Sequence, residues 1–313
     1  MPDLHIQRRK QESRLQCTPR RGVKSSKSKA HPSGAAHITT PRSALVPYLV
    51  PHAKSDPLIV HKRHPEHYDK WWITKDGSLR DGIGDPMQEL PIEAVSPVMA
   101  IMEDWEDEID TFWTAMRVVF HMPRQDDCCG SHIHVSGGHN TPFSLSQVKI
   151  IAFGVVLYEP LIQQLLMANR TNNRYCVANT MHSAQLSACR GNRRETARLI
   201  RNARNAGDLC GIMQDDRYVL WNFANTLPNK SGTIEFRGGR CLRGEVRTKR
   251  WIACTVSLVD AILRMNNIKR PGEVTLSHWT PDSLYAAVKK SARALDLRGS
   301  LPDDYRILNE TQR

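Results

Sequence analysis

The stretch that decides the fold is Gly130-Ser131-His132-Ile133-His134-Val135-Ser136, in which polar and aliphatic residues alternate. Consecutive side chains of a β-strand point to opposite faces of its sheet. This segment is therefore predicted to be a strand with His132, His134 and Ser136 on one face and two aliphatic residues on the other. One face suits a hydrophobic core, and the other carries ionisable groups.

A second segment, Thr233-Ile234-Glu235-Phe236-Arg237, has the same alternation, with Glu235 and Arg237 on one face. Glycines flank it on both sides, and glycine in a strand allows close approach of a ligand or a second backbone. If both polar faces line one concavity, two histidines, a glutamate and an arginine converge there. The alternative is an ordinary solvated strand surface, for which a mixture of Lys, Thr and Glu is more typical.

These residue types indicate a site for a cation and a phosphate group. Glutamate oxygens suit Mg²⁺ or Mn²⁺, imidazoles suit Mn²⁺ or Zn²⁺, and the arginine fork matches phosphate oxygens. Asp76 and Glu93 are two further acidic candidates, although Asp76 alone is typical of a turn and Glu93 alone of a solvated strand. A zinc alternative would use Cys128 or Cys129 with the histidines, but a second spaced pair of ligands is lacking.

The chain has 313 residues, 40% of them hydrophobic, and a net charge of +12. Basic residues are concentrated near the N-terminus, so residues 1–56 are predicted to be a basic disordered tail. A domain over residues 57–300 and a C-terminal tail over 301–313 complete the division. The tail offers a nucleic-acid-binding hypothesis, which ranks last because no reading helix or aromatic platform is visible.

The expected location is the cytoplasm, with the basic tail as an argument for the nucleus. The first residues are polar and basic with no apolar run, and the cysteines are scattered. The most apolar stretch, residues 148–167, is interrupted by charged and polar residues, which predicts a buried helix and no membrane partner.

Periodicity predicts a mixture of helices and strands without regular alternation, which favours an α+β fold with a mostly antiparallel sheet covered on one side. Helices are predicted to begin near Asp104, at Ser144 with a kink at Pro160, at Arg193 with an end at Gly207, at Arg250, and at Thr280-Pro281. Strands are predicted over residues 71–75, 90–96, 131–136, 218–225 and 233–237.

Several short motifs, taken in order, resemble a known family. They are Trp72-x-x-x-Asp76-Gly77-Ser78, Glu93-x-x-Ser96-Pro97, Gly130-x-His132-x-His134-x-Ser136, Arg170-x-x-Asn173-x-Tyr175-Cys176 and Glu235-Phe236-Arg237. Over about residues 68 to 265 the chain is similar to the amidoligase family of the glutamine synthetase and glutamate–cysteine ligase superfamily. The resemblance implies a glutamine-synthetase-like domain, with a curved antiparallel sheet, helices on its convex side, and ATP and divalent metal ions on its concave side.

The resemblance also implies roles for individual residues. The implied metal ligands are Asp76, Glu93, His132 and Glu235. The implied catalytic residues are Glu235 and Arg237, of which the arginine steadies the transferred phosphoryl group. The implied binding residues for nucleotide, phosphate or substrate are His134, Ser136, Arg170, Asn173 and Arg174.

The implied activity is an ATP- and Mg²⁺-dependent (or Mn²⁺-dependent) carboxylate–amine ligase that forms an amide through an acyl phosphate. Its partners would be a small-molecule or peptide carboxylate and an amine, in roles that range from peptide tagging to secondary metabolism. One departure stands out. Family members begin with a Gly-x-Glu-x-Glu strand that binds metals. In this chain the glutamates of residues 1–67 are Glu12 and Glu66, and neither lies in such a motif. The expected domain therefore lacks its first strand, and a homologue that binds a nucleotide or partner without ligation is the alternative.

Overall fold

A computed structural model describes residues 5–15, 71–75, 90–120, 129–138, 141–171, 173–274 and 276–309. In these ranges the strands are β1 (His5–Leu15), β2 (Trp72–Lys75), β3 (Leu90–Val95), β4 (Met99–Ala100), β5 (Gly130–Ser136), β6 (Trp221–Asn222) and β7 (Ile234–Arg240). They form a sheet in the order β2-β3-β1-β5-β7-β6, with β4 also beside β1, and every pairing between them is antiparallel.

The α-helices in the described ranges are α2 (Trp105–Val119), α3 (Leu145–Leu157), α4 (Glu159–Leu165), α5 (Ala168–Thr171), α6 (Asn179–His182), α7 (Ala184–Ala188), α8 (Arg193–Asn202), α9 (Ala206–Met213), α10 (Glu245–Met265) and α11 (Pro281–Ala294). Short 3₁₀ helices are η2 (Ala224–Thr226), η3 (Asn267–Lys269), η4 (Arg298–Ser300) and η5 (Tyr305–Asn309). The mixture, with an antiparallel sheet, confirms the predicted α+β class.

Strand β5 has one face in the hydrophobic core and one polar face, as its alternation predicts. Ile133 and Val135 are fully buried in the core, and Ile234 and Phe236 of β7 join them there. The Phe236 ring stacks near Trp251 of α10, with 5.8 Å between the ring centroids. The histidines of β5 consequently lie on the opposite face.

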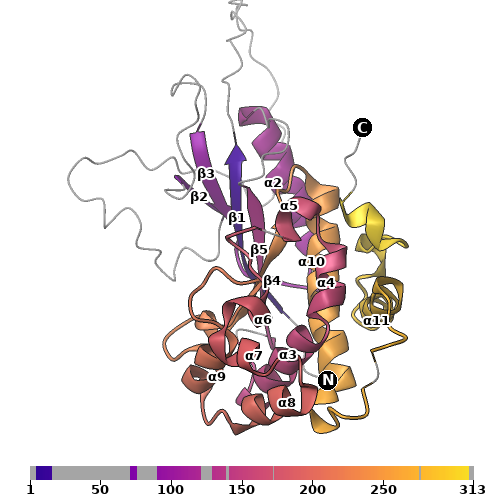
Figure 1. Ribbon diagram of the computed structural model, residues 1–313. Helices are drawn as coiled ribbons and strands as arrows, with labels where there is room; N and C mark the ends of the chain where they lie inside the picture. Colours follow the sequence, from indigo (N-terminus) through magenta and orange to yellow (C-terminus); the bar gives the residue numbers. More distant parts are fainter. Residues whose placement is uncertain are drawn as a thin grey trace, which may run out of the picture.

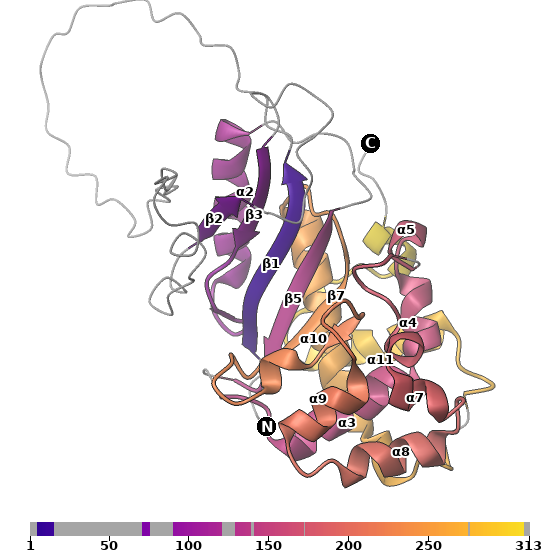
Figure 2. The same ribbon diagram turned by 60° about the vertical axis from the view of Figure 1, so that its left-hand side comes forward.

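Helix α10 is the central helix of the core. It lies between the sheet and α11 (Figures 1 and 2) and is buried along most of its length. Trp113 of α2 donates a hydrogen bond from Nε1 to the Thr248 hydroxyl of α10 at 2.9 Å, inside the core. Helices α2, α3 and α11 all pack on α10, so the helices that flank it are held through this element.

The predicted helix signals are largely confirmed. Ser144 and Gln147 form the expected capping box of α3, and Thr280 caps α11. The kink expected at Pro160 is a break at Tyr158 that bends α3 from α4 by 71°. Among the described residues no single helix is long and apolar enough to cross a membrane, and only this bent pair meets the length and composition together.

Four boundaries differ from the predictions by three residues or more, and one of them is the end of β7, which lies at Arg240 and not at Arg237. Helix α8 ends at Asn202, because Asn205 caps a new helix, α9, whose first turn contains Gly207. Helix α10 begins at Glu245, five residues ahead of the predicted start. The strand predicted over residues 218–225 is reduced to β6, since the Asn222 side chain accepts a hydrogen bond from the backbone N–H of Ala224 and turns the chain into η2.

The most consequential correction concerns β1, which lies between β3 and β5 (Figure 2). Disorder is therefore the wrong prediction for residues 5–15, and the sheet does not lack a first strand. Composition describes side chains, whereas strand pairing uses the backbone N–H and C=O groups that almost every residue carries. Similarly, η5 and the buried Leu308 extend the ordered chain into the predicted C-terminal tail.

Gly154 provides a test of the α3–α10 contact. A Cβ atom added there would collide with the Cγ2 methyl of Ile262, a β-branched residue with little freedom to rotate in a helix. Overpacking costs about 1–3 kcal/mol, whereas the gain in helix propensity from Gly to Ala is at most about 1 kcal/mol. We therefore expect Gly154→Ala to lower the free energy of unfolding in urea.

Gly211 of α9 is the matched control, because no atom lies within 4 Å of an added Cβ there. Gly211→Ala should leave stability unchanged or raise it by up to about 1 kcal/mol. Equal denaturation midpoints for the two variants would contradict the close α3–α10 packing.

Candidate functional site

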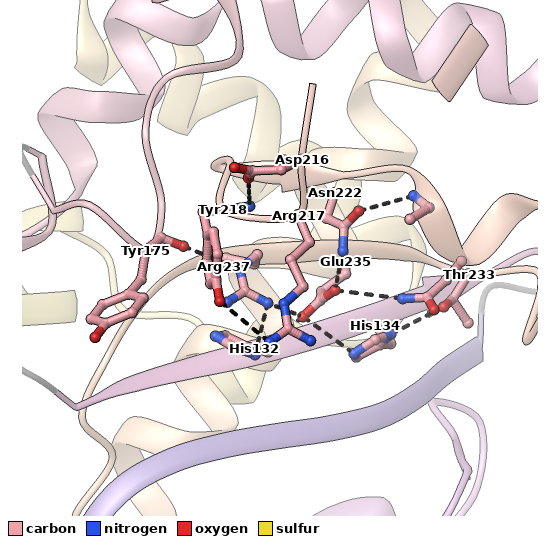
Figure 3. A network of polar contacts seen from close by, with 12 residues as sticks. His132, His134, Tyr175, Asp216, Arg217, Tyr218, Asn222, Thr233, Glu235 and Arg237 are labelled. Carbon is pink, nitrogen blue, oxygen red and sulfur yellow. Dashed lines mark hydrogen bonds and ion pairs between the residues drawn. The ribbon is translucent and has the colours of Figure 1, made fainter. Parts of the chain in front are cut away.

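The four residues singled out on β5 and β7 do converge, around the carboxylate of Glu235 (Figure 3). His134 lies directly opposite Glu235 in the antiparallel register. The Glu235 Oε1 atom is 2.9 Å from Arg237 Nη1, 3.1 Å from His132 Nδ1 and 3.7 Å from His134 Nε2. All four side chains are at least nine-tenths buried, so this is an internal charged cluster.

A bulge in β7 allows this convergence. The register between β5 and β7 shifts between Ser131 and Ile133, and Gly239 lies opposite Ser131. A Cβ atom at Gly239 would collide with the Ser131 hydroxyl, so a side chain there would push the strands apart. Bulges commonly re-aim a neighbouring side chain, and here the irregularity is adjacent to Arg237.

Arg237 is held from three directions. Besides its bond to Glu235, its Nε donates to the backbone carbonyl of Tyr175 at 3.2 Å. The Arg170 Nη2 atom donates to the backbone carbonyl of Arg237 at 2.8 Å. Arg170 can lie there because Gly130 has no side chain. A Cβ atom at this position would be only 2.5 Å from Arg170 Nη2. Arg170, predicted to bind phosphate or substrate, thus supports the β5–β7 pair in this structure.

The second carboxylate oxygen of Glu235 is also occupied. Asn222 Nδ2 donates to Oε2 at 2.7 Å, and Asn225 Nδ2 approaches it at 3.4 Å. Gln214 Nε2 in turn donates to the Asn222 side-chain oxygen at 2.7 Å. Sequence reasoning missed Asn222, and the available signal was a lone amide between Trp221 and Phe223 in an apolar run.

A chain of hydroxyls orients His134. Its Nδ1 is 3.0 Å from the Thr233 hydroxyl, which is 2.8 Å from the Ser231 hydroxyl. Nδ1 is therefore fixed by Thr233, and Nε2 is directed towards Glu235. The Nδ1 atom of His132 is closer to Glu235 Oε1, at 3.1 Å, than to Arg237 Nη1, at 3.4 Å. This favours a proton on Nδ1, because the ionised carboxylate can only accept.

The electrostatics keep Glu235 ionised. Burial alone would raise the pKa of Glu235, but His134, then His132 and then Arg237 outweigh it and hold the pKa well below its usual range. A buried carboxylate is costly to desolvate unless cations and hydrogen-bond donors surround it. The cluster satisfies this condition with donors on both oxygens.

Two loops, one containing Tyr175 and the other Tyr218, cover the cluster. Val177 and Val219 form an isolated parallel bridge that brings Tyr175 and Tyr218 over β7. Arg217 and Tyr218 reach over the cluster from the loop after α9 (Figure 3), and the Arg237 guanidinium carbon is 6.0 Å from the Tyr218 ring centroid.

The buried Asn179 fastens this cover. It donates to the carbonyls of Met213 and Trp221 at 3.0 and 2.8 Å and accepts from the Trp221 N–H at 3.0 Å. Glu159 accepts from the backbone N–H groups of Asn179 and Thr180, and burial raises the Glu159 pKa despite these bonds.

The remaining predicted residues lie around or away from the cluster. Ser136 is buried two residues beyond His134, and its hydroxyl has no hydrogen-bond partner among the described residues. Asn173 accepts from the Tyr175 N–H and so shapes the covering loop, whereas Arg174 is exposed and lies over the Tyr175 ring.

Glu93 is buried on β3, and β1 separates it from β5, which places the two strands roughly 10 Å apart. Asp76 lies outside the described residues.

The described residues do not fit a divalent metal ion. No group of three His, Cys, Asp or Glu side chains in the described ranges is arranged to hold one. Both oxygens of Glu235 already accept N–H donors, and a cation at Oε1 would lie beside the Arg237 guanidinium. Cys129, from the zinc alternative, belongs to no such group, and Cys128 is outside the described residues.

The ionisation of Glu235 leads to a pH-dependent prediction. Because its folded pKa lies below the ordinary value of 4.5, the stabilisation is present above about pH 4.5 and is lost as the pH falls through the folded pKa. At pH 7, Glu235→Gln should lower the free energy of unfolding by about 3–5 kcal/mol, since it leaves buried cations without their anion.

The measurement is urea denaturation of both proteins across this pH range. The difference between wild type and Glu235→Gln should shrink below about pH 4.5. The exposed Glu195→Gln on α8 is the control and should show no such difference. A constant difference down to low pH would show that folding does not lower the pKa of Glu235.

Comparison with known proteins gives one match. A family model described as "Putative amidoligase enzyme" matches residues 35–259, more than half of the chain, and β1 lies ahead of the matched segment. No curated protein and no solved structure matches. The matched segment contains β5, β7 and the whole charged cluster, and on this basis the chain belongs to the amidoligase family.

Proposed function

We propose that this protein is an ATP-dependent carboxylate–amine ligase that uses the Glu235 cluster to bind and activate a carboxylate. The family membership supports a ligase-type function. The observation that carries the proposal is the burial of two imidazoles, a carboxylate and a guanidinium on one face of β5 and β7. Burying such charges is no more stabilising than apolar packing, so the cluster is better explained by a role in binding or catalysis.

The proposed reaction has two steps that balance without an oxidant or reductant. The substrate carboxylate attacks the terminal phosphorus of ATP, which gives an acyl phosphate and ADP. An amine then attacks the acyl carbon, loses a proton and displaces phosphate, so an amide remains. Such chemistry depends mainly on positioning and on stabilising negative charge.

Arg237 is the proposed oxyanion-binding residue. Its Nη1 and Nε are held by Glu235 and the Tyr175 carbonyl, and its Nη2 has no hydrogen bond to a described residue. Nη2 therefore remains for an incoming oxyanion, and Glu235 acts as a positioning residue that fixes the guanidinium plane. The proposed roles belong to protein side chains alone, because the described residues do not fit a metal ion.

A second candidate is a homologue that binds a nucleotide without turnover. It is favoured by a specific observation: both oxygens of Glu235 are occupied, and no metal-binding group is assembled among the described residues. In this case ATP would stabilise the protein against heat but would not be converted to ADP. A ligand at 100 times its Kd contributes about 2.7 kcal/mol.

The test is ADP release from ATP in the presence of Mg²⁺ and a panel of amino acids, with hydroxylamine as the amine. Hydroxylamine converts an acyl phosphate to a hydroxamate, so the acceptor carboxylate need not be known beforehand. We expect ADP and hydroxamate from wild type in equal amounts. Arg237→Lys should reduce both by about 10²–10³-fold, the usual loss for one oxyanion donor.

Arg201→Lys, an exposed substitution on α8, is the matched control and should retain full activity. Circular dichroism checks that both variants fold. Thermal stabilisation by ATP without any ADP or hydroxamate would support the binding homologue, and equal activity of the two lysine variants would refute the role of Arg237.

A further inference from the structure

A second cationic site lies where β7 leads into α10. A cavity of about 180 Å³ opens at the N-terminus of this 21-residue helix. Its described lining residues are Arg243, Gly244, Glu245, Val246 and Arg247. A water molecule occupies about 30 Å³ in the liquid, so the cavity has room for several waters or one tetrahedral anion.

The helix end itself attracts anions. The first N–H groups of a helix have no carbonyl partner within the helix, and the helix dipole places partial positive charge there. Gly244 occupies the N-cap position and supplies no side-chain hydrogen bond to these groups. Helix N-termini of this kind commonly bind phosphate.

The arginines around the cavity repel one another. Burial lowers the pKa of Arg240 to about 10, and Arg247 and Arg243 add to the effect. Burial, Arg243 and Arg250 likewise lower the pKa of Arg247. Because these guanidinium groups remain charged at neutral pH, their proximity is a cost that a bound anion would relieve.

The one carboxylate among the described lining residues is already paired. Glu245 accepts a hydrogen bond from Arg117 of α2. Burial alone would raise the pKa of Glu245, but its own backbone N–H and then Arg117 hold the pKa below its ordinary value. A Cβ atom at Gly244 would be 3.0 Å from Arg117 Nη2, so a further cation reaches the helix end.

Arg247 is the observation that points to a ligand. Its side chain is only 7% exposed, it lines the cavity, and its Nε has no hydrogen-bond partner among the described residues. A buried guanidinium without a complete set of acceptors is unfavourable. Phosphate oxygens match the guanidinium fork in geometry and in charge.

We infer that the cavity at the N-terminus of α10 binds a phosphate group, which is held by Arg243, Arg247 and the backbone N–H groups of Val246 and Arg247. The Glu245 N–H is not among these donors, because it already donates to the Glu245 carboxylate. The site lies at the end of β7, beyond the Glu235 cluster, and the inference does not depend on the ligase proposal. The phosphate could belong to free inorganic phosphate or pyrophosphate, or to the polyphosphate of a nucleotide. The shared chemistry is a compact anion with several oxygens on one phosphorus.

Isothermal titration calorimetry of the full chain at fixed ionic strength tests this site, with inorganic phosphate, pyrophosphate, ATP and adenosine as separate probes. We expect saturable binding of at least one phosphate compound and none of adenosine. Equal affinity for pyrophosphate and ATP would identify the free anion, and at least tenfold tighter binding of ATP would identify a nucleotide.

Arg247→Met should weaken this binding at least tenfold, and the exposed Arg198→Met on α8 should leave it unchanged. Methionine removes the buried charge, so without phosphate the variant should be as heat-stable as wild type or more so. Arg243→Ser, at a less buried position, serves as the second variant if Arg247→Met does not fold. The inference is overturned if no phosphate compound binds wild type, or if binding survives in both variants.

The outcomes are separable from those of the ligase assay. Loss of hydroxamate formation with intact phosphate binding would reject the ligase proposal alone. Loss of phosphate binding in Arg247→Met with unchanged hydroxamate formation would establish a separate anion site.

Discussion

The ionised carboxylate of Glu235, buried where β5 and β7 pair, is the constraint on which the rest of the site depends. Removing such a group from water costs several kcal/mol unless donors surround it. In this protein Arg237, His132 and Asn222 supply donors within 3.1 Å. The register of the two strands is therefore strongly specified, because a slip of one residue would send these side chains to the opposite face.

The same requirement explains the architecture around the cluster. Glycine at position 239 permits the bulge, and glycine at position 130 makes room for Arg170 beneath the Arg237 carbonyl. The covering loop, fastened by Asn179, provides the Tyr175 carbonyl that holds the guanidinium on its other side. Positions that look like connecting segments in the sequence thus fix the orientation of a single arginine.

Sequence reasoning succeeded where the signal is local. Alternation over residues 131–136 and 233–237 identifies which side chains share a face, and antiparallel pairing then brings the faces together. It failed for β1, whose polar sequence has no alternation, because its place in the sheet depends on backbone pairing with β3 and β5. Asn222 was not predicted and Thr233, although on the same face as Glu235, was given no role, because an amide or a hydroxyl gains its role only from the partner that the fold brings near it.

The arginines at the end of β7 could not have been predicted as a group. Positions 240, 243 and 247 have helical spacing, but Arg240 ends β7 and only Arg247 lies in a helix, so the turn from β7 into α10 is what brings them together. A run of basic residues ordinarily indicates a solvated surface. Arg240 and Arg247 are buried, and this burial, which cannot be read from the sequence, is what makes their mutual repulsion costly.

The middle of β7 and the N-terminus of α10 therefore present one electrostatic problem in two forms. Arg237 is neutralised from within the chain by Glu235, and that carboxylate limits how much of the guanidinium an external anion can contact. At the N-terminus of α10 the lining carboxylate, Glu245, is paired with Arg117, so Arg247 has no equivalent neutralising partner among the described lining residues. A bound phosphate at the second position would supply from solution the charge that Glu235 supplies at the first, and the two sites would differ chiefly in where the anion originates.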